Sequence, residues 1–324
     1  MAGVIINDQE LAKLSTSSAK LRKELLKMPV FALGDFLQHV TLRTGIRYSE
    51  TVGELTGSME LGPYSETRID SDDVNITPRT LYTFLGSVVK KFSPNKIYQS
   101  IWGSNFTKGE ALKSTDITQQ VLAFLSKKVG EALYWAQWNA VRNDGGEKTK
   151  DLFNGFDTIT KKEIDGDKIS AALGNQYVLD ISTIDATNAV DTLKSVWRAA
   201  DDHLKAQKCK LFVPPSILDF YNDDYKATTG NIAYNQQFNQ TFVEGSENKC
   251  EICALPNKAN SEFLHLTTRQ NMLVGVNQMG EDETVSVEKH EAFVLQFIMT
   301  MFYGVEFESI NKERLLVVGK AKQG

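Results

Sequence analysis

One feature of this sequence limits the possible folds more than any other, and it is a single long helical pattern in the middle of the chain. Apolar residues recur at helical spacing between Asp116 and Asn143. They are Ile117, Val121, Leu125, Val129, Ala132, Ala136 and Ala140. Asp116 with Gln119 can cap the start, and Gly145 with Gly146 can end the helix. About 28 residues at 1.5 Å each give roughly 42 Å, far above the mean for globular domains, so we expect this helix to be a backbone element for the whole molecule.

The end of this helical pattern is unusually aromatic. The stretch EALYWAQWNAVRN places Tyr134, Trp135 and Trp138 on consecutive turns. These side chains could form a stacking surface for a ligand, or the helix could be packed on more than one side. A base-stacking surface needs basic neighbours, and only Arg142 is near. Because the three aromatic residues spread over more than one face of a helix, we predict that they pack against protein on two sides.

Composition excludes several classes of protein. With 324 residues and 41% apolar content, the chain can bury a large core in one large or two intimate domains. The net charge of -5 argues against a protein whose main task is to grip nucleic acid. The start MAGVIINDQE lacks a signal-peptide pattern, and no apolar run is long enough to cross a bilayer. Three cysteines cannot all pair, so we expect a reduced, intracellular setting and no membrane partner.

The usual motifs of catalysis and cofactor binding are missing from the sequence. It contains no GxGxxG after a strand, no GxxxxGK[ST], no HExxH and no GxSxG. The C-x-x-C of Cys250 and Cys253 is the sharpest candidate, but on a strand two residues three apart face opposite sides. A zinc site would need two more ligands, for which Cys209 and a histidine remain. We predict no catalytic, metal or cofactor site, and the alternative is a cytosolic α+β enzyme or metal-binding protein that uses Cys250 and Cys253.

The first quarter of the chain changes character twice. A helix capped by Asn7 runs to Pro29. From about Thr44 to Ile76 the chain is rich in glycine, serine, threonine and acidic residues, and it is too long for an ordinary connection. Alternating pieces such as Thr67 to Val74 allow two strands folded back about Gly62 and Pro63. The segment predicts an extended two-stranded arm, with a surface loop as the alternative.

The remaining segments alternate between strands and helices. PRTLYTFLGSVVKKFSP predicts a strand pair or one long strand, and residues from Val190 to Leu204 predict an amphipathic helix. CKLFV predicts a strand stopped by Pro214 and Pro215, before a short helix ILDFYND capped by Ser216. Residues 223–249 predict a polar, mobile tip. The segments predicted as later strands are EFLHLT, NMLVGV, TVSVEKH and AFVLQFIMTMFYGVEF, the last of them covered on both faces.

The order of these parts resembles the major capsid proteins of tailed phages, which have the Hong Kong 97-type fold shared with encapsulins. The resemblance covers essentially the whole chain, and no catalytic motif contributes to it. Its most specific pieces are the strand into Ser93 and Pro94, the helix from Asp116 to Asn143 followed by LFNGF, the KLFVPPSILDFY turn, and LTTRQNMLVGVNQ leading to VSVEKHEAF and GVEF. The predicted fold class is α+β.

The resemblance implies a division of the chain into named parts. They are an N-terminal arm at residues 1–43, an extended β-hairpin loop at 44–76, a peripheral domain at 77–154 with a spine helix at 116–143, an axial α/β domain at 155–280, and a return to the peripheral domain at 281–324. The polar tip of the axial domain is expected at the centre of each hexamer or pentamer.

The function implied by the resemblance is that of a structural protein, not an enzyme. Hexamers and pentamers would form an icosahedral shell around double-stranded DNA, assembled in the host cytoplasm and found in the virion. The acidic charge fits a shell with only weak, non-specific DNA contact. An encapsulin-type compartment is the alternative.

The resemblance also implies partners and modifications. A separate scaffolding protein is expected because few residues precede the extended loop, and a portal and possible decoration proteins are further partners. We expect no trimming of the N-terminus, since the sequence begins at Met1. No lysine occurs between Lys27 and Lys90, so no isopeptide crosslink from the extended loop is expected. The residues predicted at subunit interfaces are Tyr48, Glu54, Met59, Tyr64, Arg68, Trp135, Trp138, Tyr234 and Phe238.

Overall fold

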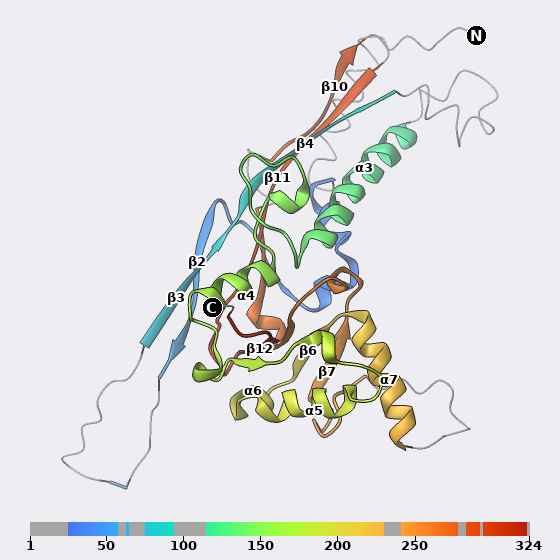
Figure 1. The fold of residues 1–324 in the computed structure, drawn as a ribbon. Helices are drawn as coiled ribbons and strands as arrows, with labels where there is room; N and C mark the ends of the chain where they lie inside the picture. The colour runs from blue at the N-terminus through green and yellow to red at the C-terminus, as the bar shows by residue number, and fades with distance from the viewer. Residues whose placement is uncertain are drawn as a thin grey trace.

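The computed structural model describes residues 25–57, 63–64, 75–93, 115–229, 241–277, 283–291 and 294–322. The molecule is elongated, with long strands and a long helix at one end and a helix-covered sheet at the other (Figure 1). A two-stranded hairpin leaves the body between these ends. The fold is thus a mixture of helices and sheets, as the sequence predicts.

The first sheet is built around one very long strand. This strand, β11 (Val294–Phe307), pairs on one edge with β10 (Val285–Glu291) and then β9 (Met272–Val276), both antiparallel. Its other edge pairs with β4 (Phe84–Phe92), and β1 (Thr41–Arg43) extends the sheet beyond β9 in parallel. Along the first part of β11, side chains alternate between buried and half-buried, so only one face of this half of the sheet meets the core.

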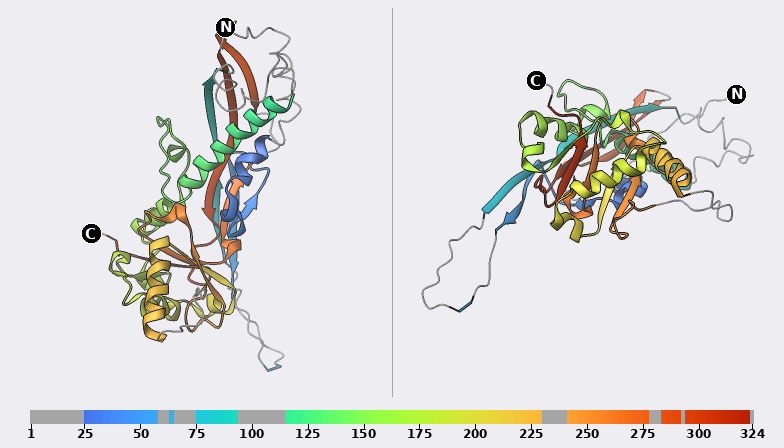
Figure 2. Two further views of the ribbon diagram at one scale, coloured as in Figure 1. Left: turned by 90° about the vertical axis from the view of Figure 1, so that its right-hand side faces the viewer. Right: turned by 60° about the horizontal axis from the view of Figure 1, so that its bottom comes forward.

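The long helix α3 (Thr115–Ala136) runs alongside β4, β10 and β11 (Figures 1 and 2). It ends at Ala136, so the prediction that it continues to Asn143 is wrong. The cause lies in the next helix, α4 (Phe156–Asp165). Backbone N–H groups at its start donate to carbonyls that follow α3, from Gly155 to Ala140 (2.8 Å) and from Phe156 to Gln137 (3.0 Å). These bonds satisfy carbonyls that a longer helix would use internally.

Residues 25–31 are helical and cross α3 at Gly130. A Cβ at Gly130 would lie only 2.3 Å from the Pro29 carbonyl oxygen, so the close crossing requires glycine. The predicted N-terminal helix therefore extends slightly past Pro29. Its start at Asn7 lies outside the described residues. The short 3₁₀ helices among the described residues are η1 (Gly34–Gln38), η3 (Thr149–Asp151), η4 (Ala171–Leu173), η5 (Ile181–Thr183), η6 (Pro256–Lys258) and η7 (Arg269–Asn271).

The hairpin consists of β2 (Ser49–Thr56) and β3 (Asn75–Tyr82), which pair antiparallel as a sheet of their own. The predicted two-stranded arm is thus present, although its strands lie at the two ends of the segment. The expected strand over 67–74 lies outside the described residues. PRTLYTFLGSVVKKFSP forms two strands, because the chain breaks at the buried Thr83 and passes from β3 of the hairpin into β4 of the first sheet.

The second sheet has five strands in the order β5 (Gln176–Val178), β12 (Leu315–Gly319), β8 (Leu264–Thr267), β6 (Cys209–Val213) and β7 (Cys250–Ala254). Helices α5 (Ala189–Ala199), α6 (Asp202–Ala206) and α7 (Pro215–Thr229) lie near it in Figure 1, and α5 and α7 pack on its outer face. Its strands face two hydrophobic clusters, because alternate residues point to opposite sides. Leu315 and Val317 join the cluster under α3 and the first sheet, whereas Leu316 and Val318 join the cluster under α5 and α7.

Two predicted boundaries in this region change. The single helix expected from Val190 to Leu204 is two helices, because the chain extends at Ala200 and Asp201 starts α6 by accepting a hydrogen bond from the His203 N–H. The strand CKLFV ends before Pro214 and Pro215 as predicted, but the helix expected over ILDFYND with Ser216 as its cap begins at Pro215, where the missing N–H costs nothing. Residues 223–229 of the predicted tip belong to α7. No helix in the described residues is long and apolar enough to cross a membrane.

Candidate assembly surfaces

The base of the hairpin carries an exposed aromatic residue. Tyr48 is 59% exposed and has a positive φ of 69°, an unusual conformation for a residue with a side chain. Its carbonyl accepts a hydrogen bond from Thr83 N–H at 2.8 Å, and its ring packs edge-on against Phe302 of β11 at 5.1 Å. Tyr48 thus joins the hairpin to the first sheet and stays largely exposed, with the Arg47 guanidinium 5.9 Å from the centre of its ring. Tyr64 is 90% exposed, and Met59 and Arg68 lie outside the described residues.

Glu54, predicted at an interface between subunits, is engaged within its own chain. Its Oε1 accepts a hydrogen bond from Arg314 Nε at 2.9 Å, and the carboxylate is mostly buried. On the neighbouring strand, Arg79 Nη2 lies 2.8 Å from Glu306 Oε1 and 2.9 Å from Glu163 Oε1. Burial raises the pKa of Glu306 despite the opposing effect of Arg79. The sequence analysis did not identify Arg79. The pattern that points to it is a charged residue at a position of an alternating strand that faces inward.

Of the aromatic residues near the end of α3, one tryptophan lies on the surface and the other in the core. Trp135 is 60% exposed and its ring meets Tyr134 edge-on at 5.5 Å. Trp138 is completely buried, and its indole N–H donates to Asn257 Oδ1 at 3.1 Å. It therefore packs in the core of its own chain and offers no surface to a second subunit. Of the two predicted tryptophans, only Trp135 is available for such a contact. The two predicted tip residues, Tyr234 and Phe238, lie outside the described residues.

A buried charged cluster lies beside Trp138, where α3 meets α4 and the second sheet. Lys258 of η6 has no exposed surface, and its Nζ donates to Asp157 Oδ1 (3.2 Å) and Ser261 Oγ (2.9 Å). The same Nζ lies 3.1 Å from His265 Nδ1 and 3.6 Å from the centre of the Trp138 ring. Burial lowers the pKa of Lys258 to about 8, against the attraction of Asp157. Burial and the Lys258 charge hold the pKa of His265 well below its usual range.

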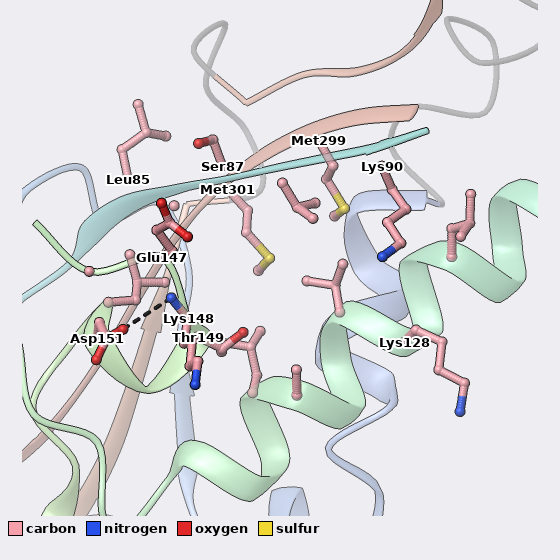
Figure 3. Close-up of a pocket in the computed structure, with 18 of the residues that line it drawn as sticks. Leu85, Ser87, Lys90, Lys128, Glu147, Lys148, Thr149, Asp151, Met299 and Met301 are labelled. Carbon is pink, nitrogen blue, oxygen red and sulfur yellow. Dashed lines mark hydrogen bonds between the residues drawn. The ribbon is translucent and has the colours of Figure 1, made fainter. Parts of the chain in front are cut away.

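A groove of about 820 Å³ separates α3 from the first sheet (Figure 3). Met299 and Met301 of β11 lie on its sheet side, and Lys90 of β4 and Lys128 of α3 lie on opposite sides. The loop before α4 closes one end with Lys148. Lys128 is paired with Glu131 of its own helix. Apolar and charged side chains both line the groove, so it offers a surface for contact.

The three cysteines are free and buried. Cys209 and Cys250 face each other on the parallel strands β6 and β7 and belong to the hydrophobic cluster under α5 and α7. Cys253 belongs to the cluster under α3 and the first sheet. The expectation that Cys250 and Cys253 face opposite sides is confirmed. Burial raises the pKa of Cys253 to about 12. In the described part of the chain, no three potential ligands gather to hold a metal ion.

Comparisons with known proteins identify the fold. No family model matches the sequence, and no curated protein matches it. Among solved structures, the chain is similar to one described as the satellite phage P4 procapsid including size determination (Sid) protein. That match has a TM-score of 0.58 at 10% identity and covers 94% of this chain and 99% of the other.

Two further solved structures are similar over nearly the whole chain. The capsid of a native GTA particle matches with a TM-score of 0.54 at 14% identity, covering 99% of this chain and 93% of that one. A structure from Mycobacterium phage Bobi matches with a TM-score of 0.50 at 10% identity, covering 90% and 91%. At such identities the likeness concerns the fold alone. The chain therefore has the phage capsid-protein fold that the order of its segments predicts.

Proposed function

We propose that this chain is a major capsid protein that self-assembles as hexamers and pentamers into an icosahedral shell enclosing double-stranded DNA. The observation that carries the proposal is the match in fold to a phage procapsid over 94% of the chain. Because the match also covers 99% of the other chain, the likeness extends over nearly the whole of both folds. The fold alone does not specify function, so surface features must support the proposal.

The described surface supports an assembling protein in two ways. The hairpin leaves the body and pairs with no other strand of the described chain, as an element that reaches a neighbour would. Exposed aromatic residues occur at separate places, with Tyr48 and Tyr64 in the hairpin segment and Trp135 on the spine helix. Closed shells are stabilised by many repeated contacts of modest size, for which scattered aromatic anchors are suited. We propose these three residues as interface residues.

The charge of the chain is consistent with this role. A shell must enclose DNA without adhering to it strongly, and a net charge of -5 leaves only weak, local contact with phosphates. We propose a separate scaffolding protein, a portal and possible decoration proteins as partners. Assembly would occur in the host cytoplasm, and the mature protein would be part of the virion.

The test is electron microscopy of the expressed chain, with and without a scaffolding partner. Closed, regular particles are expected in at least one of these conditions. A chain that stays monomeric under all assembly conditions would contradict the proposal. An encapsulin-type compartment is the second candidate, since encapsulins share this type of fold. Particles formed around a protein cargo, with no DNA, would favour that alternative.

A further inference from the structure

Only a small hydrophobic cluster joins the described part of the hairpin to the body. Strands β2 and β3 pair only with each other among the described strands. Of their described side chains, Val52 and Leu81 are the two that enter a hydrophobic cluster, where they meet Ile46 and Leu273. So small a cluster can hold the base of the hairpin but does not by itself fix the angle at which a two-stranded ribbon leaves the body.

Charged residues of opposite sign lie on the same face of the hairpin as this cluster. In the hairpin register Val52 pairs with Arg79 and Glu54 pairs with Thr77, so Arg79 and Glu54 are diagonal neighbours on the body-facing side. The body presents the opposite signs to them. Glu306 and Glu163 face Arg79, and Arg314 faces Glu54, as the distances above establish.

The geometry at Arg79 specifically requires arginine. One guanidinium nitrogen, Nη2, contacts the carboxylates of Glu306 on β11 and Glu163 on α4, while Nε donates to the Phe307 carbonyl oxygen at 3.1 Å. All three side chains are mostly buried. A planar fork can reach acceptors on two elements at once, whereas a lysine ammonium is a single point charge on a flexible stem. Arg79 therefore joins three elements of structure, β3, β11 and α4.

We propose that Arg79 and Glu54 form a two-sided ionic clamp that sets the angle of the hairpin relative to the body. Because the two strands carry opposite charges, rotating the hairpin or shifting it along the body would bring Arg79 toward Arg314 or Glu54 toward Glu306. The clamp thus selects one orientation as well as holding it. Its consequence for assembly, that the hairpin of one copy is aimed at the next, rests on the proposed function. The clamp itself is a property of the single chain.

The test measures the hairpin angle in the unassembled full-length chain. Spin labels are placed on cysteines introduced at Ile76 of the hairpin and Val141 of the body, both of which are exposed. A second label pair, Val141 and Leu173, lies within the body and serves as the internal reference. The three natural cysteines are buried, so the labels react at the introduced sites. Pulsed electron–electron double resonance then gives the distribution of distances between the two labels of each pair.

Arg79→Met is expected to at least double the width of the Ile76–Val141 distribution and to leave the Val141–Leu173 distribution unchanged. Glu54→Gln should broaden it as well, and Arg79→Lys should restore the native width only in part. Lys205→Met, which removes an exposed ion pair with Asp202 on α6, is the matched control and should change neither distribution. Should Arg79→Met fail to fold, Arg79→Met/Glu306→Gln is measured in its place, because it removes the acid on β11 while Glu163 keeps its ion pair with Lys168.

Unchanged widths in both the Arg79 and Glu54 variants would overturn the clamp, whether or not the native chain forms shells. Particle formation is scored separately. If the native chain assembles and Arg79→Met gives aberrant or fewer particles along with a broad distribution, the clamp aims the hairpin for assembly. If the native chain never assembles but the distribution broadens, the proposed function fails and the clamp stands.

Discussion

Lys258 Nζ lies 3.2 Å from Asp157 Oδ1 in a site where the lysine has no exposed surface and the aspartate almost none. This pair connects η6 to the first turn of α4, directly beside Trp138 at the end of the spine helix. A charge buried at such a joint is costly alone and tolerable only with its partner. The contact between η6 and α4 therefore depends on one ion pair and its hydrogen bonds.

Removal of Lys258 should destabilise the chain strongly. Lys258→Met keeps the length of the side chain but leaves Asp157 buried without its counter-ion, so a loss of about 3 kcal/mol or more is expected. The double variant Lys258→Met/Asp157→Asn should recover most of that loss, because it leaves no buried charge. Urea unfolding of the three proteins measures the difference. Equal stabilities for the single and double variants would contradict the assigned role of Asp157.

The lowered pKa of Lys258 predicts a specific dependence of stability on pH. Between about pH 8 and pH 10.5 the unfolded chain holds a proton on this lysine that the folded chain has released. Folding is therefore favoured progressively as pH rises through this window, by at most about 3 kcal/mol. Urea unfolding at pH 7.5, 8.5 and 9.5 should reveal this rise relative to Lys258→Met/Asp157→Asn. Parallel curves for the two proteins would refute it.

The two tryptophans should respond differently to truncation. Trp138→Ala empties a fully buried site and removes the hydrogen bond to Asn257, so a loss of about 3 to 5 kcal/mol is expected. Trp135→Ala acts on an exposed ring and should change the stability of the monomer by less than about 0.5 kcal/mol. Under the proposed function it should nevertheless lower the yield of particles. Thermal unfolding and electron microscopy separate the two effects, and a large fall in melting temperature for Trp135→Ala would argue against its exposure.

Gly155 should tolerate no side chain. A Cβ there would lie 2.3 Å from the Trp138 carbonyl oxygen. At this place the N–H groups that begin α4 donate to the carbonyls that follow α3. Gly155→Ala is expected to cost more than about 1 kcal/mol through this overlap. Gly145→Ala is the matched control, because its nearest neighbour would be the Asn143 side chain at 3.8 Å. Similar melting temperatures for both variants would mean that the backbone can move apart at Gly155 without cost.

Part of this fold can be predicted from the sequence because local patterns determine it. The apolar runs CKLFV and NMLVGV predict buried strands, and the apolar spacing between Ile117 and Ala136 predicts a helix; the structure has those strands and that helix. The order of segments was also enough to predict the capsid-type fold. The helix end was predicted seven residues too late because the hydrogen bonds that end it come from Gly155 and Phe156, which no local pattern reveals.

The candidate interface residues divide in the same way. The sequence by itself determined that Tyr48, Glu54, Trp135 and Trp138 are conspicuous, since aromatic and charged residues stand out in any strand or helix pattern. Only the tertiary structure decided that Trp138 is core and Trp135 is surface, because burial depends on what packs against each face of α3. It likewise decided that Glu54 meets Arg314 and that Arg79 meets Glu306, partners more than two hundred residues away. Ion pairs of that kind form only when elements far apart in the sequence come together in the fold. Local sequence patterns do not show which of those elements will meet.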